Sequence, residues 1–393
     1  MDFRSDRWWR GGVIASVDST DIEDGAPDEG SADDISLGRR LLSWQTIVSF
    51  ALGIGLLVLL LTRVQVDLRQ TLATIAQTNV GLFLLALFVY YLGFPIRGLR
   101  WRQMLLNAGA GEQIRKTGTT LAQLTEILYL SWFVNCLVPA KLGDVFRAYL
   151  LKQRTGVRGM RTVGTVVAER ILDLTVLLLL LAGTGWLTLR DKVPAEVQLA
   201  IEIGLALLGV AGLGLLAMRY LDALFQRLVP ARFHSVYERF HQGILLSFRG
   251  FPSLLGYTLL VWLTETARLA LVSWSIGLRL APDPLVELGL FVFIALAAAA
   301  LTAIPATPAG LGIVDGLIVT SFTWIGLATG TIVSPAQATA VAVLDRSISY
   351  GSLVLFGAIV YLVSSYRTAA QPAVVRREPA VDVGRQLTDV GRK

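Results

Sequence analysis

Charged side chains recur inside the apolar segments of this 393-residue sequence, and they are its strongest candidates for chemistry. Two acid–arginine dipeptides, Glu169-Arg170 and Asp345-Arg346, lie within long hydrophobic runs. A charge at the centre of a membrane-spanning helix costs roughly 2.5–3.5 kcal/mol, so such residues are rare and usually functional. Further charges in similar surroundings are Arg97, Arg100, Glu126, Asp173, Glu265 and Arg268.

Spacing predicts which of these charges meet. Glu169 and Asp173 are four residues apart and share a helix face, whereas Glu265 and Arg268, three apart, can pair. At about 1.5 Å per residue, Glu169 lies roughly 10 Å and Asp345 roughly 13 Å inside its helix. In a hydrocarbon core about 30 Å thick, the two dipeptides could therefore approach each other. Two interpretations stay open: the charges only lock helices together, or they line a polar path.

The pattern Pro-Ala-x-Leu-Gly interrupts the apolar sequence twice, at 139–143 and at 308–312. A helix is expected after the first break, and its free N–H groups, beside Lys141 and Arg147, could receive an anion. Asp144 is expected to cap that helix or to pair with Arg147. The alternative is that both breaks only terminate helices. The residues expected to shape the two turns are Pro139, Gly143, Pro305, Pro308, Gly310 and Gly312.

The composition indicates which elements position these residues. The chain is 54% hydrophobic and 16% charged, with a mean hydropathy of +0.61, which excludes an ordinary soluble protein. We expect an all-α polytopic membrane protein. A further amphipathic segment, 221–250, is expected to lie in the membrane interface, with a solvated loop as the alternative. The apolar helices are expected near 44–62, 80–98, 121–138, 162–189, 199–218, 252–279, 284–303, 313–329 and 336–364.

Charge and motif content narrow the function. Residues 1–38 hold ten of the 29 acidic and three of the 35 basic residues, which predicts a disordered acidic tail. The basic remainder favours contact with anionic lipid headgroups and not with nucleic acid. Cys136 is the only cysteine, and no phosphate-binding loop, nucleophile elbow or zinc motif occurs, so neither a metal nor a cofactor is expected. Residues 366–393 are expected to form a flexible tail.

Basic residues also predict the topology. They crowd 97–116 and 141–161, on both sides of 121–138, and basic loops stay cytoplasmic. Segment 121–138 is therefore expected to turn at Pro139 as a re-entrant hairpin, which requires surrounding protein. Matching motifs divide residues 39–365 into repeats of about 80–189 and 252–364. Because one crossing separates them, the repeats are expected to be inverted, with six spans, two hairpins and cytoplasmic termini. The alternative is eight spans and one hairpin.

Four motifs resemble a known family: NCLVPAKLGDVFRAYLL, AERILDL, PATPAGLGIVDG and LDRSISY. They are similar to the lysylphosphatidylglycerol synthase transmembrane region, also called the flippase-like family, over roughly 44–365. Asp144 and Asp315 depart from the family pattern, because glutamate is common at these two positions in the family. The soluble aminoacyl-transferase domain is not expected, so lysyl transfer to lipid is not expected either. On the family's motifs fall Asn135, Pro139, Gly143, Asp144, Arg147, Glu169, Arg170, Asp173, Pro308, Gly310, Gly312 and Asp315.

The resemblance and the charged residues together predict a lipid flippase of the cytoplasmic membrane. Its substrate would be an anionic phospholipid or a polyprenyl-phosphate-linked sugar, moved passively, by proton coupling or with a partner. Two alternatives remain: a membrane glycosyltransferase using a polyprenyl-phosphate sugar, and a non-catalytic partner of a lipid-modifying synthase. A homo-oligomer is possible. The residues expected on the lipid path are Arg97, Arg100, Asn135, Lys141, Asp144, Arg147, Glu169, Arg170, Asp173, Glu265, Arg268, Asp315, Asp345 and Arg346.

Overall fold

The computed structural model describes residues 44–63, 67–138, 141–189, 192–221, 230, 233–302 and 307–369, and within these ranges it holds helices and no strand. All nine predicted apolar helices are present, and the helix expected after Pro139 forms as well. The helices are α2 (Trp44–Arg63), α3 (Leu68–Ala76), α4 (Val80–Leu105), α5 (Gly111–Lys116), α6 (Leu121–Leu137), α7 (Leu142–Thr155), α8 (Gly159–Thr184), α9 (Ala195–Tyr220), α11 (His234–Ser247), α12 (Phe251–Ser275), α13 (Pro284–Thr302), α14 (Ile313–Thr329), α15 (Pro335–Arg346) and α16 (Leu353–Ala369).

Shorter elements extend or connect these helices. Three π-helical segments follow α4, α8 and α15 directly, and a 3-10 turn precedes α14. Two short helices, α3 and α5, were not predicted because neither carries a long apolar run. The short elements are η2 (Leu106–Ala110), η3 (Gly185–Leu189), η6 (Pro308–Gly310) and η7 (Ser347–Ser352).

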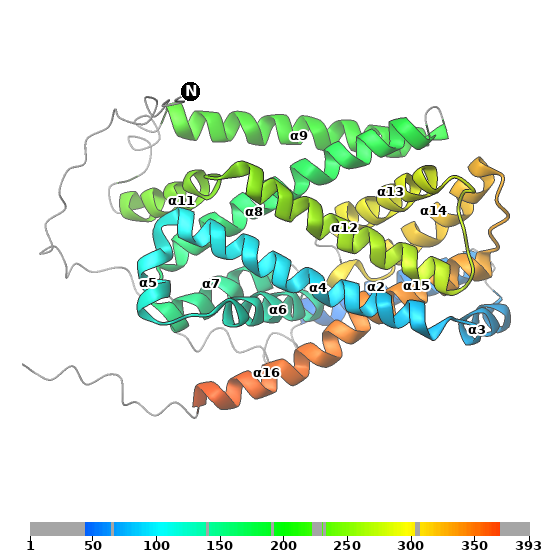
Figure 1. The fold of residues 1–393 in the computed structure, drawn as a ribbon, viewed down its shortest axis with the longest axis horizontal. Coiled ribbons are helices and arrows are strands. Elements are labelled where there is room, and N and C mark those ends of the chain that lie inside the picture. The colour runs from blue at the N-terminus through cyan, green and yellow to red at the C-terminus, as the bar shows by residue number, and fades with distance from the viewer. Residues whose placement is uncertain are drawn as a thin grey trace, which may run out of the picture. The chain divides into compact units, whose positions relative to one another are not determined.

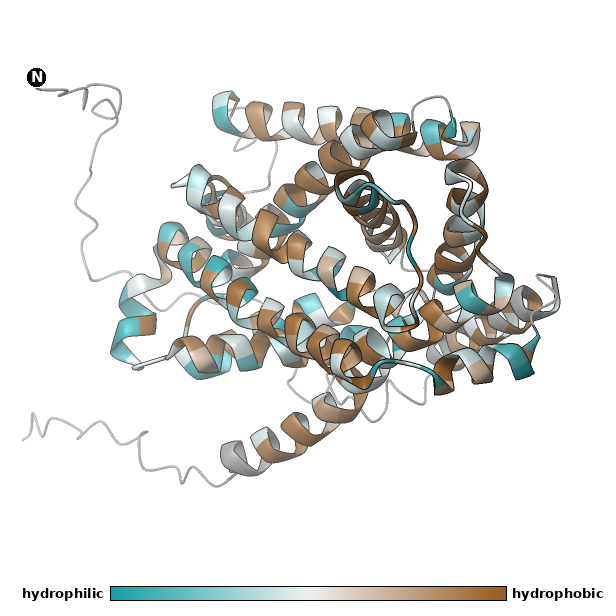
Figure 2. Cartoon of the chain, turned by 45° about the vertical axis from the view of Figure 1, so that its right-hand side comes forward, coloured by the Kyte–Doolittle hydropathy of each residue, from teal (hydrophilic) through white to brown (hydrophobic). Residues whose placement is uncertain are grey.

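The chain is an all-α polytopic membrane protein. Six helices of the described ranges are long and apolar enough to cross a membrane. Hydrophobic residues cover much of their length, whereas hydrophilic residues gather mainly near helix ends and in connections (Figure 2). Two of the six are α13 and the segment η6–α14. The alternative topology, with eight spans and one hairpin, requires both of these segments to be long enough to cross the membrane. The six are Val80–Lys116, Val197–Tyr220, Phe251–Ser275, Pro284–Thr302, Pro308–Thr329 and Pro335–Ser364.

Helices α4 and α12 carry the first charged motif of each predicted repeat, and they pack along each other in opposite directions (Figure 1). The Gln103 amide donates to the Ser253 hydroxyl at 2.6 Å near one end of the pair. The Asn79 backbone N–H donates to the Ser275 carbonyl at 2.7 Å near the other end. Equivalent helices of inverted repeats must run in opposite directions, so this packing agrees with the inverted repeat, which stays a prediction.

Each sequence break joins two helices that fold back on each other. In α6–α7, Arg154 pairs with Glu126 at 3.3 Å near the open end, and the Gly143 N–H donates to Asn135 near the turn. In α13–α14, the rings of Phe291 and Phe322 lie 6.2 Å apart. The two helical hairpins lie toward opposite ends of residues 41–393 (Figure 1). Two residues expected to shape the turns, Pro139 and Pro305, fall outside the described ranges.

Contacts within the two predicted repeats correspond pair by pair. Helix α4 contacts α6 as α12 contacts α13, and α7 contacts α8 as α14 contacts α15. The long final helix of each repeat also packs on the hairpin of the other, since α8 contacts α13 and α16 contacts α6. An internal repeat predicts this correspondence, because equivalent segments make equivalent contacts.

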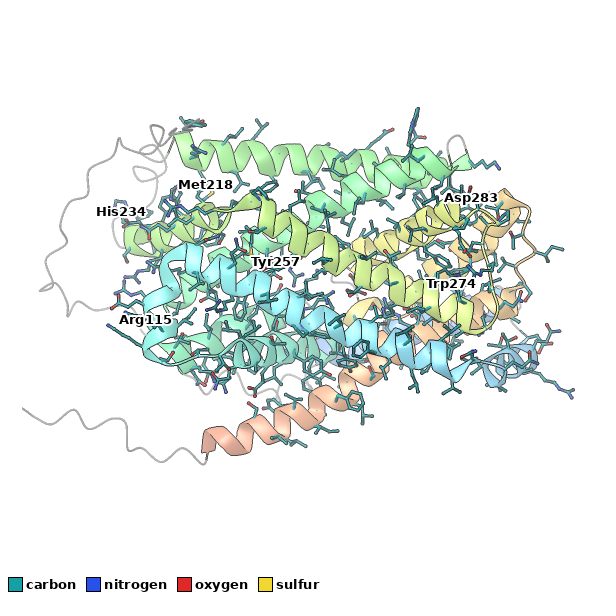
Figure 3. All side chains as sticks on the ribbon, viewed as in Figure 1. Arg115, Met218, His234, Tyr257, Trp274 and Asp283 are labelled. Carbon is teal, nitrogen blue, oxygen red and sulfur yellow. The ribbon has the colours of Figure 1, made fainter. Side chains whose placement is uncertain are left out.

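The amphipathic segment forms helix α11, so the solvated-loop alternative is wrong for Phe233–Ser247. Its contact with α8 is close because glycine faces glycine. A Cβ on Gly164 would lie 2.9 Å from the Gly243 Cα, and one on Gly243 would lie 2.5 Å from the Arg161 carbonyl oxygen. One face of α11 is thus buried against protein. Figure 3 places Arg115 and His234 at this end of the bundle, and Trp274 and Asp283 at the opposite end.

Candidate functional site

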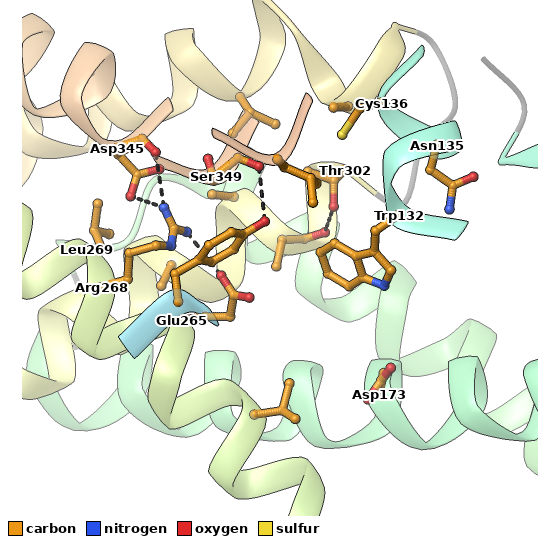
Figure 4. Close-up of a pocket in the computed structure, with 18 of the residues that line it drawn as sticks. Trp132, Asn135, Cys136, Asp173, Glu265, Arg268, Leu269, Thr302, Asp345 and Ser349 are labelled. Atoms are coloured by element: carbon orange, nitrogen blue, oxygen red, sulfur yellow. Dashed lines mark hydrogen bonds and ion pairs between the residues drawn. The ribbon is translucent and has the colours of Figure 1, made fainter. Parts of the chain in front are cut away.

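A cavity of about 260 Å³ lies where the two hairpins and the paired helices α4 and α12 meet. Figure 4 shows Arg268 and Asp345 on one side of it, and Trp132 and Asn135 on another. Apolar side chains such as Leu177 complete the wall. The charged residues that line the cavity come from both predicted repeats: Arg97, Lys141, Arg170, Asp173, Glu265, Arg268, Asp345 and Arg346.

Behind this wall, Arg100 joins two carboxylates of α8. Its side chain is only 1% exposed, and it donates to Glu169 at 2.8 Å and to both oxygens of Asp173, one of them at 3.1 Å. Arg147 donates to the other oxygen of Glu169, also at 2.8 Å. Glu169 and Asp173 therefore share one arginine, as their spacing along one helix face predicts. The cluster is buried, which makes each charge dependent on its partners.

Asp144 and Arg170 connect the first hairpin to α8. The Arg170 Nη2 donates to Asp144 Oδ1 at 2.9 Å, and its Nε donates to Oδ2 at 3.2 Å. Asp144 lies 3.9 Å from Arg147 and does not cap α7, whose N-cap residue is Lys141. The capping prediction is therefore wrong. The antiparallel course of α7 and α8 brings Arg170 to Asp144 in two-point geometry, which is stronger than a contact one turn away.

The second repeat contains the corresponding pairs. Arg268 donates to Asp345 and, at 3.1 Å, to Glu265, so the predicted Glu265–Arg268 pair is confirmed. Arg346 donates to Asp315 at 2.9 Å, as Arg170 does to Asp144. In each dipeptide, the arginine pairs with the aspartate of the hairpin in the same predicted repeat. The acid of the dipeptide pairs with an arginine of α4 or of α12.

One ion pair joins the two repeats directly at the cavity. The Arg97 Nη2 on α4 donates to Glu265 Oε1 on α12 at 2.5 Å. The Arg97 guanidinium also lies 4.6 Å from the ring centre of Trp132, on the first hairpin. Arg97 therefore ties the first hairpin, α4 and the second repeat together at one point.

The two breaks have the same backbone feature at the third residue of the pattern. Lys141 has φ 53° and Gly310 has φ 71°, both in the left-handed region that favours glycine. The Gly143 N–H donates to the Asn135 side chain at 2.8 Å, and the Asp144 N–H donates to the Lys141 carbonyl at 3.1 Å. These two N–H groups are therefore satisfied within the protein and are not free to receive an anion.

The cavity wall nevertheless offers one cationic side chain without a partner. The Lys141 ammonium, on this wall, makes no hydrogen bond or ion pair among the described residues. The wall carboxylates Asp173, Glu265 and Asp345 all accept from arginines. Three nitrogen atoms of wall residues also lack a partner among the described residues, but they are themselves buried and not exposed to the cavity: Arg97 Nη1, Arg268 Nε and Trp262 Nε1. A wall with an unpaired ammonium suits a ligand that supplies acceptors.

Residues 47–357 match the family model for the lysylphosphatidylglycerol synthase TM region. The chain belongs to this family. A UPF0104 membrane protein of Methanocaldococcus jannaschii is 31% identical over 61% of this chain and 97% of that protein. Glycosyltransferase AglD of Haloferax volcanii is 26% identical over 88% of this chain but only 59% of that protein. A UPF0104 membrane protein of Pyrococcus horikoshii is 22% identical over 79% and 95%. No solved structure matches the chain.

In this member of the lysylphosphatidylglycerol synthase TM family, several predicted residues lie outside the cavity wall. They support the wall from behind, except Glu126, which pairs with Arg154 in a more exposed position at the open end of the first hairpin. No cluster of three possible metal ligands occurs in the described ranges. The predicted residues of those ranges that do not line the wall are Arg100, Glu126, Gly143, Asp144, Arg147, Glu169, Pro308, Gly310, Gly312 and Asp315.

Sequence reasoning missed a set of hydroxyl groups beside the cavity. Tyr90 donates to the Ser349 carbonyl at 3.2 Å, and the Tyr91 hydroxyl lies 2.9 Å from Ser352 Oγ and 3.3 Å from the Tyr129 hydroxyl. Both serines lie in the π-helix η7, directly after Asp345-Arg346, and π-helical turns are frequent at functional sites. The polar run SISYGS, inside an otherwise apolar helix, was the available signal.

A second cluster at the opposite end was also missed. Glu287, only 2% exposed, accepts from the Leu280 N–H at 3.0 Å, from the Trp274 indole N–H at 3.3 Å and from Arg279 at 2.8 Å. It joins the end of α12 to the start of α13, and no residue of this cluster lines the cavity. Its role in the described structure is to hold this connection together.

Proposed function

We propose that this protein moves a membrane lipid with a phosphate-bearing headgroup between the leaflets. The observation that carries the proposal is one central cavity whose wall combines basic side chains, among them the unpaired Lys141, with apolar side chains. A phosphate is rich in acceptors and negatively charged, so it suits the Lys141 ammonium. The acyl or isoprenoid tails would stay in the lipid phase.

The arrangement of the two hairpins supports movement between the leaflets. Helical hairpins α6–α7 and α13–α14 open toward opposite ends, and residues of both breaks, Lys141 and Ala309, line the same cavity. Transporters built from inverted repeats place their substrate site at such a junction near the bilayer midplane. The headgroup would enter beside one hairpin and leave beside the other. The basic end around α5 and α11 would face the cytoplasm.

The hairpin ion pairs are the groups to test. We expect Arg170→Ala and Arg346→Ala each to lower lipid movement at least tenfold, because each frees its hairpin aspartate and alters the cavity wall. The assay uses the full chain in proteoliposomes with a fluorescent phosphatidylglycerol whose outer-leaflet label is destroyed by dithionite. Arg115→Ala, exposed on α5, is the matched control. Unchanged movement in both cavity variants contradicts the proposal.

One relative gives a second candidate, because Glycosyltransferase AglD is similar to 88% of this chain. A glycosyltransferase acting on a polyprenyl-phosphate sugar would need a carboxylate free to act as a base. In the cavity, Asp173, Glu265 and Asp345 are each held by an arginine, so transport fits these residues better. Sugar transfer by the purified protein from a lipid-linked donor would favour the enzyme. Inactivity alone with copurification of a synthase would favour a partner role.

A further inference from the structure

We infer that Lys141 makes the cavity selective for headgroups that carry one net negative charge. This inference rests on the proposed function, and it specifies the class of lipid that the same cavity takes. It excludes zwitterionic and cationic headgroups as preferred ligands. The argument depends on the charge balance of the buried groups, on the missing partner of Lys141 and on its backbone conformation.

The charge balance follows from the ion pairs around the cavity. Every described acid and arginine of the two clusters has an opposite partner, so those twelve groups sum to zero charge at neutral pH. Lys141 is the one cationic residue of the wall outside these pairs, which leaves a net charge of +1. The groups are Arg97, Arg100, Arg147, Arg170, Arg268 and Arg346 against Asp144, Glu169, Asp173, Glu265, Asp315 and Asp345.

An uncompensated charge in a partly buried site is costly, and an anion with one charge removes that cost. A phosphodiester such as phosphatidylglycerol brings one negative charge. A zwitterionic headgroup brings none and leaves the excess in place, whereas a cationic headgroup doubles it. The Lys141 ammonium has three donors and makes no hydrogen bond among the described residues, so it can donate to the phosphate oxygens.

The backbone at Lys141 holds the side chain at the turn of the first break. Its φ of 53° is a left-handed conformation, which costs a residue with a Cβ energy that glycine avoids. The equivalent residue of the second break is Gly310, with φ 71°, and its neighbour Ala309 is also left-handed, with φ 48°. The turn itself therefore accepts a residue with a Cβ, and at position 141 glycine would satisfy the backbone without adding the one unbalanced charge.

Binding of three lipids with identical dioleoyl tails tests the inference. The purified full chain in detergent is titrated with phosphatidylglycerol (one negative charge), phosphatidylcholine (neutral overall) or ethylphosphatidylcholine (one positive charge), with bound lipid counted by native mass spectrometry. We expect wild-type protein to bind the anionic lipid on the order of ten- to a hundredfold more tightly than the neutral one, as a charge-assisted hydrogen bond would give.

Four substitutions separate charge from structure. Lys141→Gln and Lys141→Gly are expected to bind the anionic and neutral lipids within about threefold of each other, and Lys141→Glu to prefer the cationic lipid. Lys141→Arg should keep the wild-type preference. Lys141→Gly relieves the backbone strain, so it should unfold no earlier than wild type, which excludes misfolding as the cause of lost selectivity.

The outcomes distinguish this inference from the proposed function. A tenfold anionic preference that survives in Lys141→Gln, or its absence in wild type, overturns the role of Lys141 even if lipid movement is normal. The expected preference with no lipid movement in proteoliposomes overturns transport and leaves the anion site standing.

Discussion

The close approach of α6 and α7 at Gly143 makes a sharp prediction for Gly143→Ala. A Cβ there would lie 2.0 Å from the Ser131 carbonyl oxygen and 2.7 Å from Asn135 Oδ1, whereas real Cβ contacts essentially never fall below 3.0 Å. The two helices must therefore separate by about 1 Å at this point. Overpacking costs about 1–3 kcal/mol, and the lost bond from the Gly143 N–H to Asn135 about 1 kcal/mol. We expect a total loss of about 2–4 kcal/mol.

The assay is thermal unfolding of the purified protein in detergent, followed by circular dichroism at one fixed heating rate, because unfolding of such proteins is often irreversible. Gly183→Ala is the matched control: it lies inside α8, and nothing lies within 4 Å of the added Cβ. Its unfolding temperature should stay the same or rise slightly, since alanine favours helix over glycine by about 0.5–1 kcal/mol. If Gly143→Ala unfolds at the same temperature as Gly183→Ala, the hairpin contact described above is wrong.

Two further substitutions test the buried charges by the same unfolding measurement. Glu169→Ala leaves Arg100 and Arg147 as neighbouring cations, only 1% and 2% exposed, and should cost about 3–5 kcal/mol; a loss below about 1 kcal/mol would mean that the cluster is hydrated. Glu287→Ala removes the acceptor of two buried N–H groups and should cost about 2–4 kcal/mol. Asp283→Ala, which removes only the exposed cap of α13, should cost about 1 kcal/mol, and equal losses would refute this difference.

The helices could be predicted from the sequence because hydropathy is a local property. Each apolar run of sufficient length forms a helix in the structure, and the chain folds back between α6 and α7. Re-entry of this hairpin into the membrane, expected from the basic residues on both sides of 121–138, stays a prediction. The short helices α3 and α5 lack a long apolar run. Asn135 was predicted to lie on the lipid path, and it does line the cavity, but its amide oxygen is used by the Gly143 N–H.

The partners of the charges were harder to predict, because pairing depends on tertiary structure. Spacing within one helix correctly gave the Glu265–Arg268 pair. The same logic gave the Asp144–Arg147 pair, which is present at 3.9 Å, but not the closer contact of Asp144 with Arg170, which reaches it from another helix. The contacts among the tyrosine and serine hydroxyls near η7 were not predicted, because each of these residues is common in an apolar helix. Only the packing of α4, α6 and η7 brings them together.

The distribution of ion pairs bears on how the two repeats could move. Among the described residues, the cavity pairs fall within one repeat or the other, except the pair of Arg97 with Glu265. Displacing one repeat against the other would break this pair, and Glu265 would still keep Arg268. The Arg97 side chain is only 4% exposed and would lose its one acidic partner among the described residues, so this pair resists the displacement. The packing of α4 against α12, of α8 against α13 and of α16 against α6 adds to that resistance.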